Sequence, residues 1–235
     1  MSYAIQLFNE QNALVIDGQN SLLHWLFSAQ YVVGPNTNKP LQVNWPQAVT
    51  SQQPPMVFQK LNASGYGCGN FRQLGSPGNW TGMTISPDIV GTTETYTYCV
   101  AVFMPPRSSG AWGVQMWDAQ GGLILDAGYP QMVFQYATRT YRRDGPINQS
   151  GYNRTWYWTT TDTFAVSANS YILISNFTGY LQDGAGVGNI PSYGYFRANT
   201  TMAQYYQNYD VLGSPSGNDP YFNWPFIYAV PSHEA

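Results

Sequence analysis

A segment near the start of the chain recurs 109 residues later, and this internal repeat constrains the fold more than any other feature. Residues 2–25 align with residues 111–134, and within residues 3–17 and 112–126 nearly every position keeps its chemical class. The identical pairs include Gln6 with Gln115, Gln11 with Gln120, Leu14 with Leu123 and Asp17 with Asp126. A repeated sequence predicts a repeated unit of structure, so we expect a chain built from two related parts.

Each copy of the repeat has the pattern of a β-hairpin. In the first copy, the alternate residues Tyr3, Ile5 and Leu7 are apolar and would line one face of a strand. A turn rich in Asn, Asp, Gln and Gly follows, and a second apolar run ends at Asp17 or Asp126. This pattern predicts a hairpin with a loop of about four or five residues.

A second likeness links later parts of the chain. Residues 74–79 are echoed by residues 212–218, and each is followed by an aromatic, strand-like run, at 96–103 and 222–230. The offset between these tails is 138 residues rather than 109, so the second copy holds about 29 additional residues in its middle.

An isolated hairpin is at best marginally stable in water, so each copy is expected to open a larger sheet. We therefore predict an all-β protein made of two tandem antiparallel β-sandwich domains related by the internal repeat. The expected domains are residues 1–106 and residues 111–235, with the longer middle insertion in the second. A short linker of Pro, Ser and Gly separates them.

The low charge of the chain excludes several classes of protein. Only 9% of residues are charged, against roughly 25% in an average soluble chain, and the formal net charge is −3. This composition does not supply the basic surface that binds nucleic-acid phosphates. Apolar stretches such as residues 22–27 are far shorter than a membrane span, so we expect no membrane insertion.

The first residues lack a cationic leader followed by an apolar run. This predicts a protein without a signal peptide, made in the cytosol. In that compartment Cys68 and Cys99 are more often small buried side chains than a disulfide, and whether they pair stays open.

The chain offers few residues for catalysis. Its two histidines lie near opposite ends, and we expect His24 to be packed in the core and His233 to lie in a solvated tail. No Gly-X-Ser-X-Gly, His-Glu-X-X-His or Cys-X-X-Cys motif occurs. We therefore expect no enzymatic activity, no cofactor and no metal site.

One catalytic alternative stays open, because a glycosidase needs only two carboxylates at a suitable separation. The nominal pairs are Asp118 with Asp126 and Asp88 with Glu94. The repeat nevertheless places Asp17 and Asp126 at equivalent strand ends, where a carboxylate ordinarily accepts hydrogen bonds from the backbone of a turn. The Gly-rich run at 183–189 lacks a strand–loop–helix context, so we expect a surface loop rather than a nucleotide site.

One cluster of basic residues stands out from this background. It is interleaved with aromatic residues and gives a candidate interaction surface. Its residues are Arg139, Tyr141, Arg142, Arg143, Tyr152, Arg154 and Trp156. Arginine and aromatic faces suit anionic sugars, phosphates or the carboxylates of a partner. The ordinary alternative, and the favoured one, is that these arginines pair with Asp144 at a protein contact.

The two repeat copies also carry a likeness to known proteins. Residues 3–17 and 112–126 follow the pattern aromatic–Gly/Ala–Val/Ile–Gln–aliphatic–aromatic–Asp/Asn–X–X–Gly–X–Leu–X–X–Asp, with Asn12-Ala13 in the first copy where the second has Gly121-Gly122. This pattern resembles the opening of small β-rich proteins from the tail tip, baseplate and fibre region of tailed bacteriophages. The resemblance implies a virion protein that is assembled in the host cytoplasm and has no catalytic residues.

The composition independently favours contacts with other proteins, because Tyr and Trp bury large areas and few charges must be desolvated. We therefore predict a non-enzymatic structural component of a phage virion, in the tail tip, baseplate or tail fibre region. Its expected partners are other tail proteins and copies of itself, with a trimer favoured. The alternative is a carbohydrate-binding module or adhesin whose exposed aromatic residues bind host-surface glycans.

Overall fold

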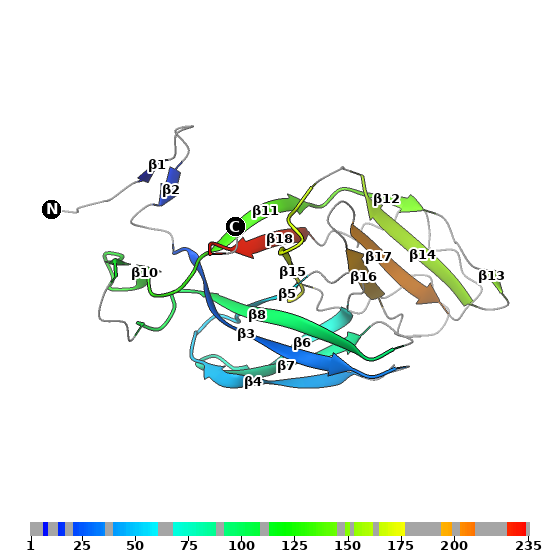
Figure 1. Ribbon diagram of the computed structural model, residues 1–235, viewed down its shortest axis with the longest axis horizontal. Coiled ribbons are helices and arrows are strands. Elements are labelled where there is room, and N and C mark those ends of the chain that lie inside the picture. The colour runs from blue at the N-terminus through cyan, green and yellow to red at the C-terminus, as the bar shows by residue number, and fades with distance from the viewer. Residues whose placement is uncertain are drawn as a thin grey trace.

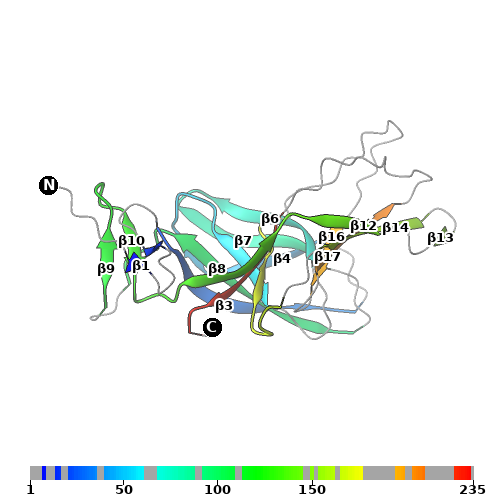
Figure 2. The same ribbon diagram turned by 90° about the horizontal axis from the view of Figure 1, so that it is seen from above.

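The computed structural model consists of β-strands joined by loops (Figures 1 and 2). It describes residues 7–8, 14–16, 21–35, 40–60, 68–87, 92–108, 113–144, 149–150, 153–161, 165–176, 194–198, 203–209 and 225–233. Its strands are β1 (Leu7–Phe8), β2 (Leu14–Ile16), β3 (Leu23–Val33), β4 (Leu41–Val49), β5 (Met56–Lys60), β6 (Cys68–Ser76), β7 (Asn79–Pro87), β8 (Glu94–Phe103), β9 (Gln115–Trp117), β10 (Leu123–Asp126), β11 (Met132–Thr138), β12 (Tyr141–Asp144), β13 (Gln149–Ser150), β14 (Asn153–Thr160), β15 (Tyr171–Leu173), β16 (Gly194–Ala198), β17 (Ala203–Tyr209) and β18 (Phe226–Pro231). The described residues hold no helix that could span a bilayer.

The strands form five sheets, and every pairing between them is antiparallel. The largest has the order β11-β18-β15-β5-β8-β3. A three-stranded sheet has the order β4-β7-β6, and a five-stranded sheet has the order β12-β14-β17-β16 with β13 paired to β14. The remaining two are the hairpins β1-β2 and β9-β10. This arrangement confirms the all-β, antiparallel class.

The inner strands of the six-stranded sheet are buried on both faces. Along β8, Tyr96, Tyr98 and Val100 belong to one hydrophobic cluster, whereas the intervening Cys99 and Ala101 belong to a second. Successive side chains in a strand point to opposite faces, so the two clusters lie on opposite sides of the sheet. The first cluster also contains residues of β4, β6 and β7, so the three-stranded sheet covers that side (Figure 1).

The two predicted hairpins form with the same pairing. In the first, Leu7 lies opposite Ile16 and Phe8 opposite Leu14. The residues found 109 positions later pair in the same way, Met116 with Leu125 and Trp117 with Leu123. Both hairpins have an irregularity at the same place in the register. The hairpins expected at the two copies of the repeat are therefore confirmed.

The likeness continues into the strands that follow the hairpins. Strand β3 begins at Leu23 and β11 at Met132, again 109 residues apart. Each is the outermost strand of the six-stranded sheet, β3 beside β8 and β11 beside β18. The register of the first pair shifts between Trp25 and Phe27, and that of the second shifts between Phe134 and Tyr136. These irregularities occupy equivalent positions of the repeat.

Two separate sandwich domains are not confirmed. The six-stranded sheet takes β3, β5 and β8 from one side of the expected boundary and β11, β15 and β18 from the other. The two groups join where β5 pairs with β15, with Phe58 opposite Leu173. Counted inward from either edge the arrangement is alike: β3, β8 and β5 from one side, and β11, β18 and β15 from the other. A half-turn about the β5-β15 junction therefore exchanges the two groups of strands. The division at residues 106–111 stays a prediction.

Backbone geometry explains the motif at residues 74–79, which forms the turn between β6 and β7. Gly75 has a φ of 106°, and a Cβ at this position would collide with the carbonyl oxygen of Asn79. Gly78 has a φ of 83°, and its N–H donates to the carbonyl oxygen of Ser51 at 2.9 Å. Such positive φ values favour glycine. The echo of this motif at 212–218 lies outside the described residues.

The shared sheet predicts that the protein unfolds as one unit. Leu173 is 3% exposed at the β5-β15 junction, so Leu173→Ala should lower the free energy of unfolding by about 2–5 kcal/mol. Denaturant unfolding, followed by fluorescence and circular dichroism, should show one transition that moves as a whole. The control Val32→Ala, at a side chain 55% exposed, should change stability by less than about 0.5 kcal/mol. Two transitions, of which only one moves, would contradict the shared sheet.

Candidate interaction surface

A buried carboxylate fastens the second hairpin to the linker. Asp126, at the end of β10, is 1% exposed. Its Oδ2 accepts hydrogen bonds from Ser108 N and Gln115 Nε2, each at 2.8 Å. Its Oδ1 accepts from Ser108 Oγ at 2.9 Å and from Gly128 N at 2.8 Å. Buried carboxylates require such partners, and the contact from Gly128 confirms the turn role predicted for this residue.

These hydrogen bonds decide the charge of the carboxyl group. Burial alone would raise the pKa of Asp126, but the hydrogen bonds from Ser108, Gly128 and Gln115 outweigh this effect and hold the pKa below its ordinary value. Asp126 is therefore ionised at neutral pH. It supplies a fixed negative charge to which the donors of the hairpin and the linker are bound.

The second hairpin is docked on the beginning of β3. The Nε2 of His24, a fully buried side chain, accepts a hydrogen bond from Asp126 N at 3.1 Å. Leu22 N donates to Ile124 O at 3.1 Å, and an isolated antiparallel bridge joins His24 to Gln131. Since β3 and β11 are the outermost strands of their sheet, the bridge brings its two edges together. The packed role expected for His24 is confirmed.

Asp126, His24 and Ser108 meet here, but not in the geometry of a catalytic triad. In a triad, the histidine takes the proton of the serine hydroxyl and the aspartate orients the histidine ring. Here the Ser108 hydroxyl donates to Asp126, and the His24 Nε2 accepts from a backbone N–H. Burial lowers the pKa of His24, against opposing effects of the Leu22 backbone and the Asp126 charge. The three residues form a structural clasp.

Asp118, the partner of Asp126 in the first nominal glycosidase pair, also accepts hydrogen bonds from the backbone. The Oδ1 of Asp118 accepts hydrogen bonds from Gln120 N at 2.9 Å and Gly122 N at 2.6 Å, which closes the turn between β9 and β10. Gly121 has a φ of 83° in this turn. Of the other pair, Asp88 lies outside the described residues.

Exposed large apolar side chains gather where the second hairpin meets the sheet. Among the described residues, six of the seven such side chains lie on or directly beside β9, at or just after the end of β8, or at the start of β11. We call these six the end surface: Phe103, Met104, Val114, Trp117, Val133 and Phe134. The seventh is Val32, near the far end of β3. Large exposed apolar patches on soluble proteins mark sites of interaction.

Backbone contacts bring the elements of the end surface together. Met104 N donates to Ser21 Oγ at 2.8 Å, and this hydroxyl lies 3.4 Å from Ile124 O, so the end of β8 meets the start of β3 and β10. Met104 has a φ of 52°, a left-handed conformation that is uncommon for residues other than glycine. Such strain is found where surrounding contacts hold it, often at functional sites.

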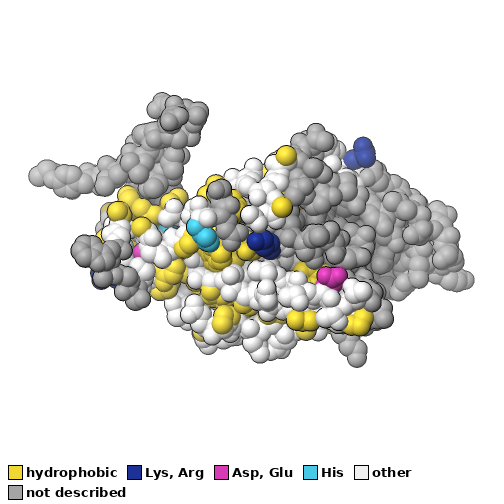
Figure 3. Space-filling view, in the orientation of Figure 1, with side chains coloured by type: hydrophobic (Ala, Val, Ile, Leu, Met, Phe, Trp, Pro, Cys, Tyr) yellow, Lys and Arg dark blue, Asp and Glu magenta, His cyan; other side chains and the backbone are white. Residues whose placement is uncertain are grey.

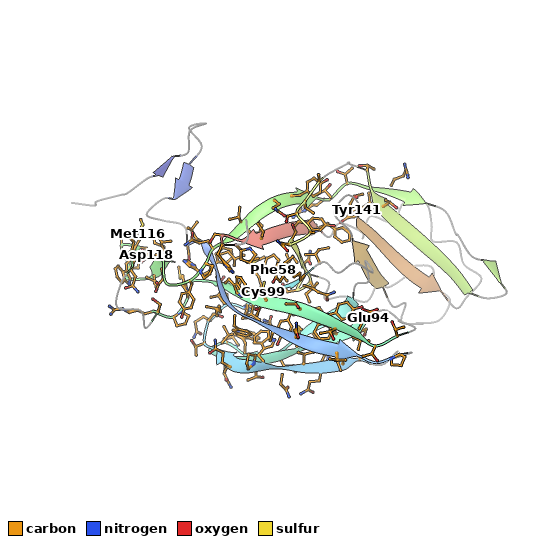
Figure 4. The ribbon with its side chains drawn as sticks, in the orientation of Figure 1. Phe58, Glu94, Cys99, Met116, Asp118 and Tyr141 are labelled. Atoms are coloured by element: carbon orange, nitrogen blue, oxygen red, sulfur yellow. The ribbon has the colours of Figure 1, made fainter. Side chains whose placement is uncertain are left out.

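The end surface lies at one extremity of the molecule. Figure 3 shows apolar side chains gathered toward the end that carries β9 and β10, with few charged groups on this face. Figure 4 places Met116 and Asp118 at this end, and Tyr141 and Glu94 well away from it. An apolar, weakly charged surface can be buried with little cost of desolvating charges.

The arginine and aromatic cluster predicted from the sequence lies elsewhere, in and beside the five-stranded sheet. Strand β12 carries Tyr141, Arg142 and Arg143, β14 carries Arg154 and Trp156, and Arg139 precedes β12. The two strands are paired, with Arg142 opposite Thr159 and Arg143 opposite Trp158. The fold therefore places the two strands side by side, while Arg154 lies further along β14, opposite Gln149 of β13.

The described side chains of this cluster have different roles. Arg139 and Arg142 are exposed, whereas Tyr141 is half-buried with its ring 5.7 Å from that of Phe226. Burial raises the pKa of Tyr141, so its hydroxyl stays neutral. The structure describes only the backbone of the other strand members, and Tyr152 lies outside the described residues. A binding role for this cluster stays a prediction.

The end surface is not evident from the sequence, because exposed and buried aromatic residues are of the same types. The repeat holds the one available signal. Trp117 and Phe134 align with Phe8 and Trp25, so an aromatic side chain recurs at both positions. Such recurrence indicates that these positions share a role in the two copies.

No protein-family model, curated protein or solved structure matches the chain. Among the described residues, no group of three or more His, Cys, Asp or Glu side chains is placed to hold a metal ion. The functional argument therefore rests on the end surface and on the clasp that supports it. The link to phage tail proteins stays a prediction.

The clasp predicts an acid-dependent loss of stability that Asp126→Asn should reduce. The side-chain amide of Asn would place N–H donors opposite Ser108, Gln115 or Gly128, which donate to Asp126 and need an acceptor. The variant should therefore lose about 1–3 kcal/mol of unfolding free energy at neutral pH. Because the folded pKa lies below the ordinary value, the carboxylate contributes fully above about pH 3.9, and its contribution is lost as the pH falls through the folded pKa. Urea unfolding across this range measures both effects.

Asp118→Asn is the matched control, because its Oδ1 can still accept the two backbone hydrogen bonds of the turn. We expect this variant to keep the stability and the acid profile of the wild type. Wild-type stability and an unchanged acid profile in Asp126→Asn would instead show that the clasp contributes nothing.

Proposed function

We propose that the protein is a non-enzymatic structural component that binds neighbouring protein subunits through the end surface. The observation that carries this proposal is the gathering of six of the seven exposed large apolar side chains at one extremity of the described structure. A chain with 9% charged residues that presents such a surface is better suited to permanent contact with other proteins than to exposure of that surface to solvent. Strain at Met104 at the same place supports the choice.

The proposed setting is the tail of a bacteriophage virion, in the tail tip, baseplate or fibre region. This part of the proposal rests on the sequence pattern of residues 3–17 and 112–126. The equal pairing of the two hairpins supports treating these segments as copies of one module. Other tail proteins and further copies of this chain are the proposed neighbours, and cyclic symmetry is the usual arrangement of such copies.

A second candidate function, glycan binding, is favoured by one residue of the same surface. Trp117 is 51% exposed at the end of β9, beside a turn that also exposes Gln120. An indole ring stacks on the apolar face of a sugar, and a nearby amide can bond its hydroxyl groups. Binding of the wild type to host glycans, lost in Trp117→Ala with no change in oligomeric mass, would favour this candidate.

The assembly proposal predicts that Trp117→Ser weakens association. A tryptophan at the centre of an interface contributes about 2 kcal/mol or more, so the association constant should fall about thirty-fold or more. Sedimentation equilibrium over a concentration series measures this change. Val32→Ser is the matched control, since Val32 is equally exposed but lies outside the end surface. A wild type that stays monomeric throughout the series would contradict assembly through copies of the chain.

A further inference from the structure

Repeat-equivalent residues on the two edge strands are covered to different degrees. His24 on β3 is fully buried, whereas its equivalent on β11, Val133, is 43% exposed. The ring of Trp25 is half-buried and stacks on that of His233, with centroids 4.7 Å apart. Its equivalent, Phe134, is 52% exposed. Strands with the same pairing thus differ in what lies over their first residues.

The cover over the start of β3 is the second hairpin. It is held there by the hydrogen bonds from Asp126 N to His24 Nε2 and from Leu22 N to Ile124 O. Three consecutive apolar residues of β10 are at most 9% exposed in this position: Leu123, Ile124 and Leu125. Docking of the hairpin therefore buries its own apolar strand together with the start of an edge strand.

The first hairpin shares two features with the second, its register and its apolar strand, so apolar packing rather than hydrogen bonding would hold it on β11. Val133 has no acceptor in the place of His24 Nε2, and Gln131 N, the equivalent of Leu22 N, donates to Ser232 Oγ at 3.2 Å. Strands β1 and β2 pair in the register of β9 and β10. The apolar run Leu14–Ile16 of β2 aligns with residues 123–125 of β10. Figure 1 shows the β1-β2 hairpin standing apart from the sheets. In the same molecule, Val133 and Phe134 at the start of β11 are exposed.

The bridge between the edge strands fits this correspondence. It places His24 opposite Gln131. The repeat offset relates His24 to Val133 and Gln131 to Leu22, so the image of the bridge is a pairing of Leu22 with Val133 in the same antiparallel register. The two edge strands therefore keep the relation of the repeat up to the point where they meet.

We propose that the start of β11, at Val133, binds the β1-β2 hairpin of a second copy of this chain. Each molecule presents both the hairpin and the surface, so two copies can exchange hairpins and form the same contact twice. The contact covers an exposed apolar side chain at the start of an edge strand. This inference rests on the proposed function and names the partner and the docking segment.

Two full-length variants separate the two sides of the contact. Val15→Asp places a charge on the hairpin, at the residue whose equivalent Ile124 is 1% exposed. Val133→Asp places a charge on the start of β11, at the equivalent of the His24 that the second hairpin covers. Light scattering after size exclusion should show an oligomeric wild type and two variants that are monomeric alone. Val32→Asp should keep the mass of the wild type, and circular dichroism should show that all variants are folded.

Mixing the two variants gives the decisive result. Val133→Asp retains an intact hairpin and Val15→Asp retains an intact β11, so the mixture should form a heterodimer that grows no further. A heterodimer supports the exchange. Oligomers that persist in both variants would overturn this inference while leaving assembly through another part of the end surface intact. A monomeric wild type whose own hairpin protects β11 from hydrogen exchange would overturn it in favour of closure within one molecule.

Discussion

The antiparallel pairing of β5 with β15 is the contact on which the rest of the structure depends. It joins the strands contributed by residues before the linker to those contributed by residues after it. A backbone hydrogen bond from Ile174 N to Val57 O, at 2.9 Å, extends the junction beyond the paired residues. Residues from both sides of the linker share each hydrophobic cluster, so neither group of strands can bury its apolar faces alone.

The curvature of this sheet explains where the candidate surface lies. Its edge strands meet at His24 and Gln131, and the second hairpin closes over the start of β3. The ionised, buried Asp126 secures that closure by binding the linker and the hairpin turn. At the start of β11 the equivalent residues are exposed. The two edge strands thus pair alike, but only the start of β3 is covered by a hairpin. The start of β11 is left as an apolar area that a partner can bury.

The sequence predicts the parts of this fold that depend on local pattern. Alternating apolar residues and turn-forming residues specify both hairpins, which pair in the same register. The same reasoning identifies Asp126 as a residue that binds the backbone of a turn. Sequence does not reveal its bond to Ser108, because that contact depends on how the linker folds back over β10.

The shared sheet could not be predicted for a similar reason. An expectation of separate sandwiches follows from the repeat and the linker, whereas the junction depends on which exposed strand edges meet in space. The arginine and aromatic cluster was located by residue type. Its strands do lie side by side, but residue type does not distinguish a half-buried Tyr141 from an exposed Arg142. Burial is a property of the assembled sheets.

Native-state hydrogen exchange at the β5-β15 junction tests the central claim most directly. If the two groups of strands form one sheet, the amides of Ile174 and of β8 should exchange only through global unfolding, with equal opening free energies and equal dependence on denaturant. A markedly lower opening free energy for β15 and β18 than for β5 and β8 would contradict the account, because it would show two units that open independently.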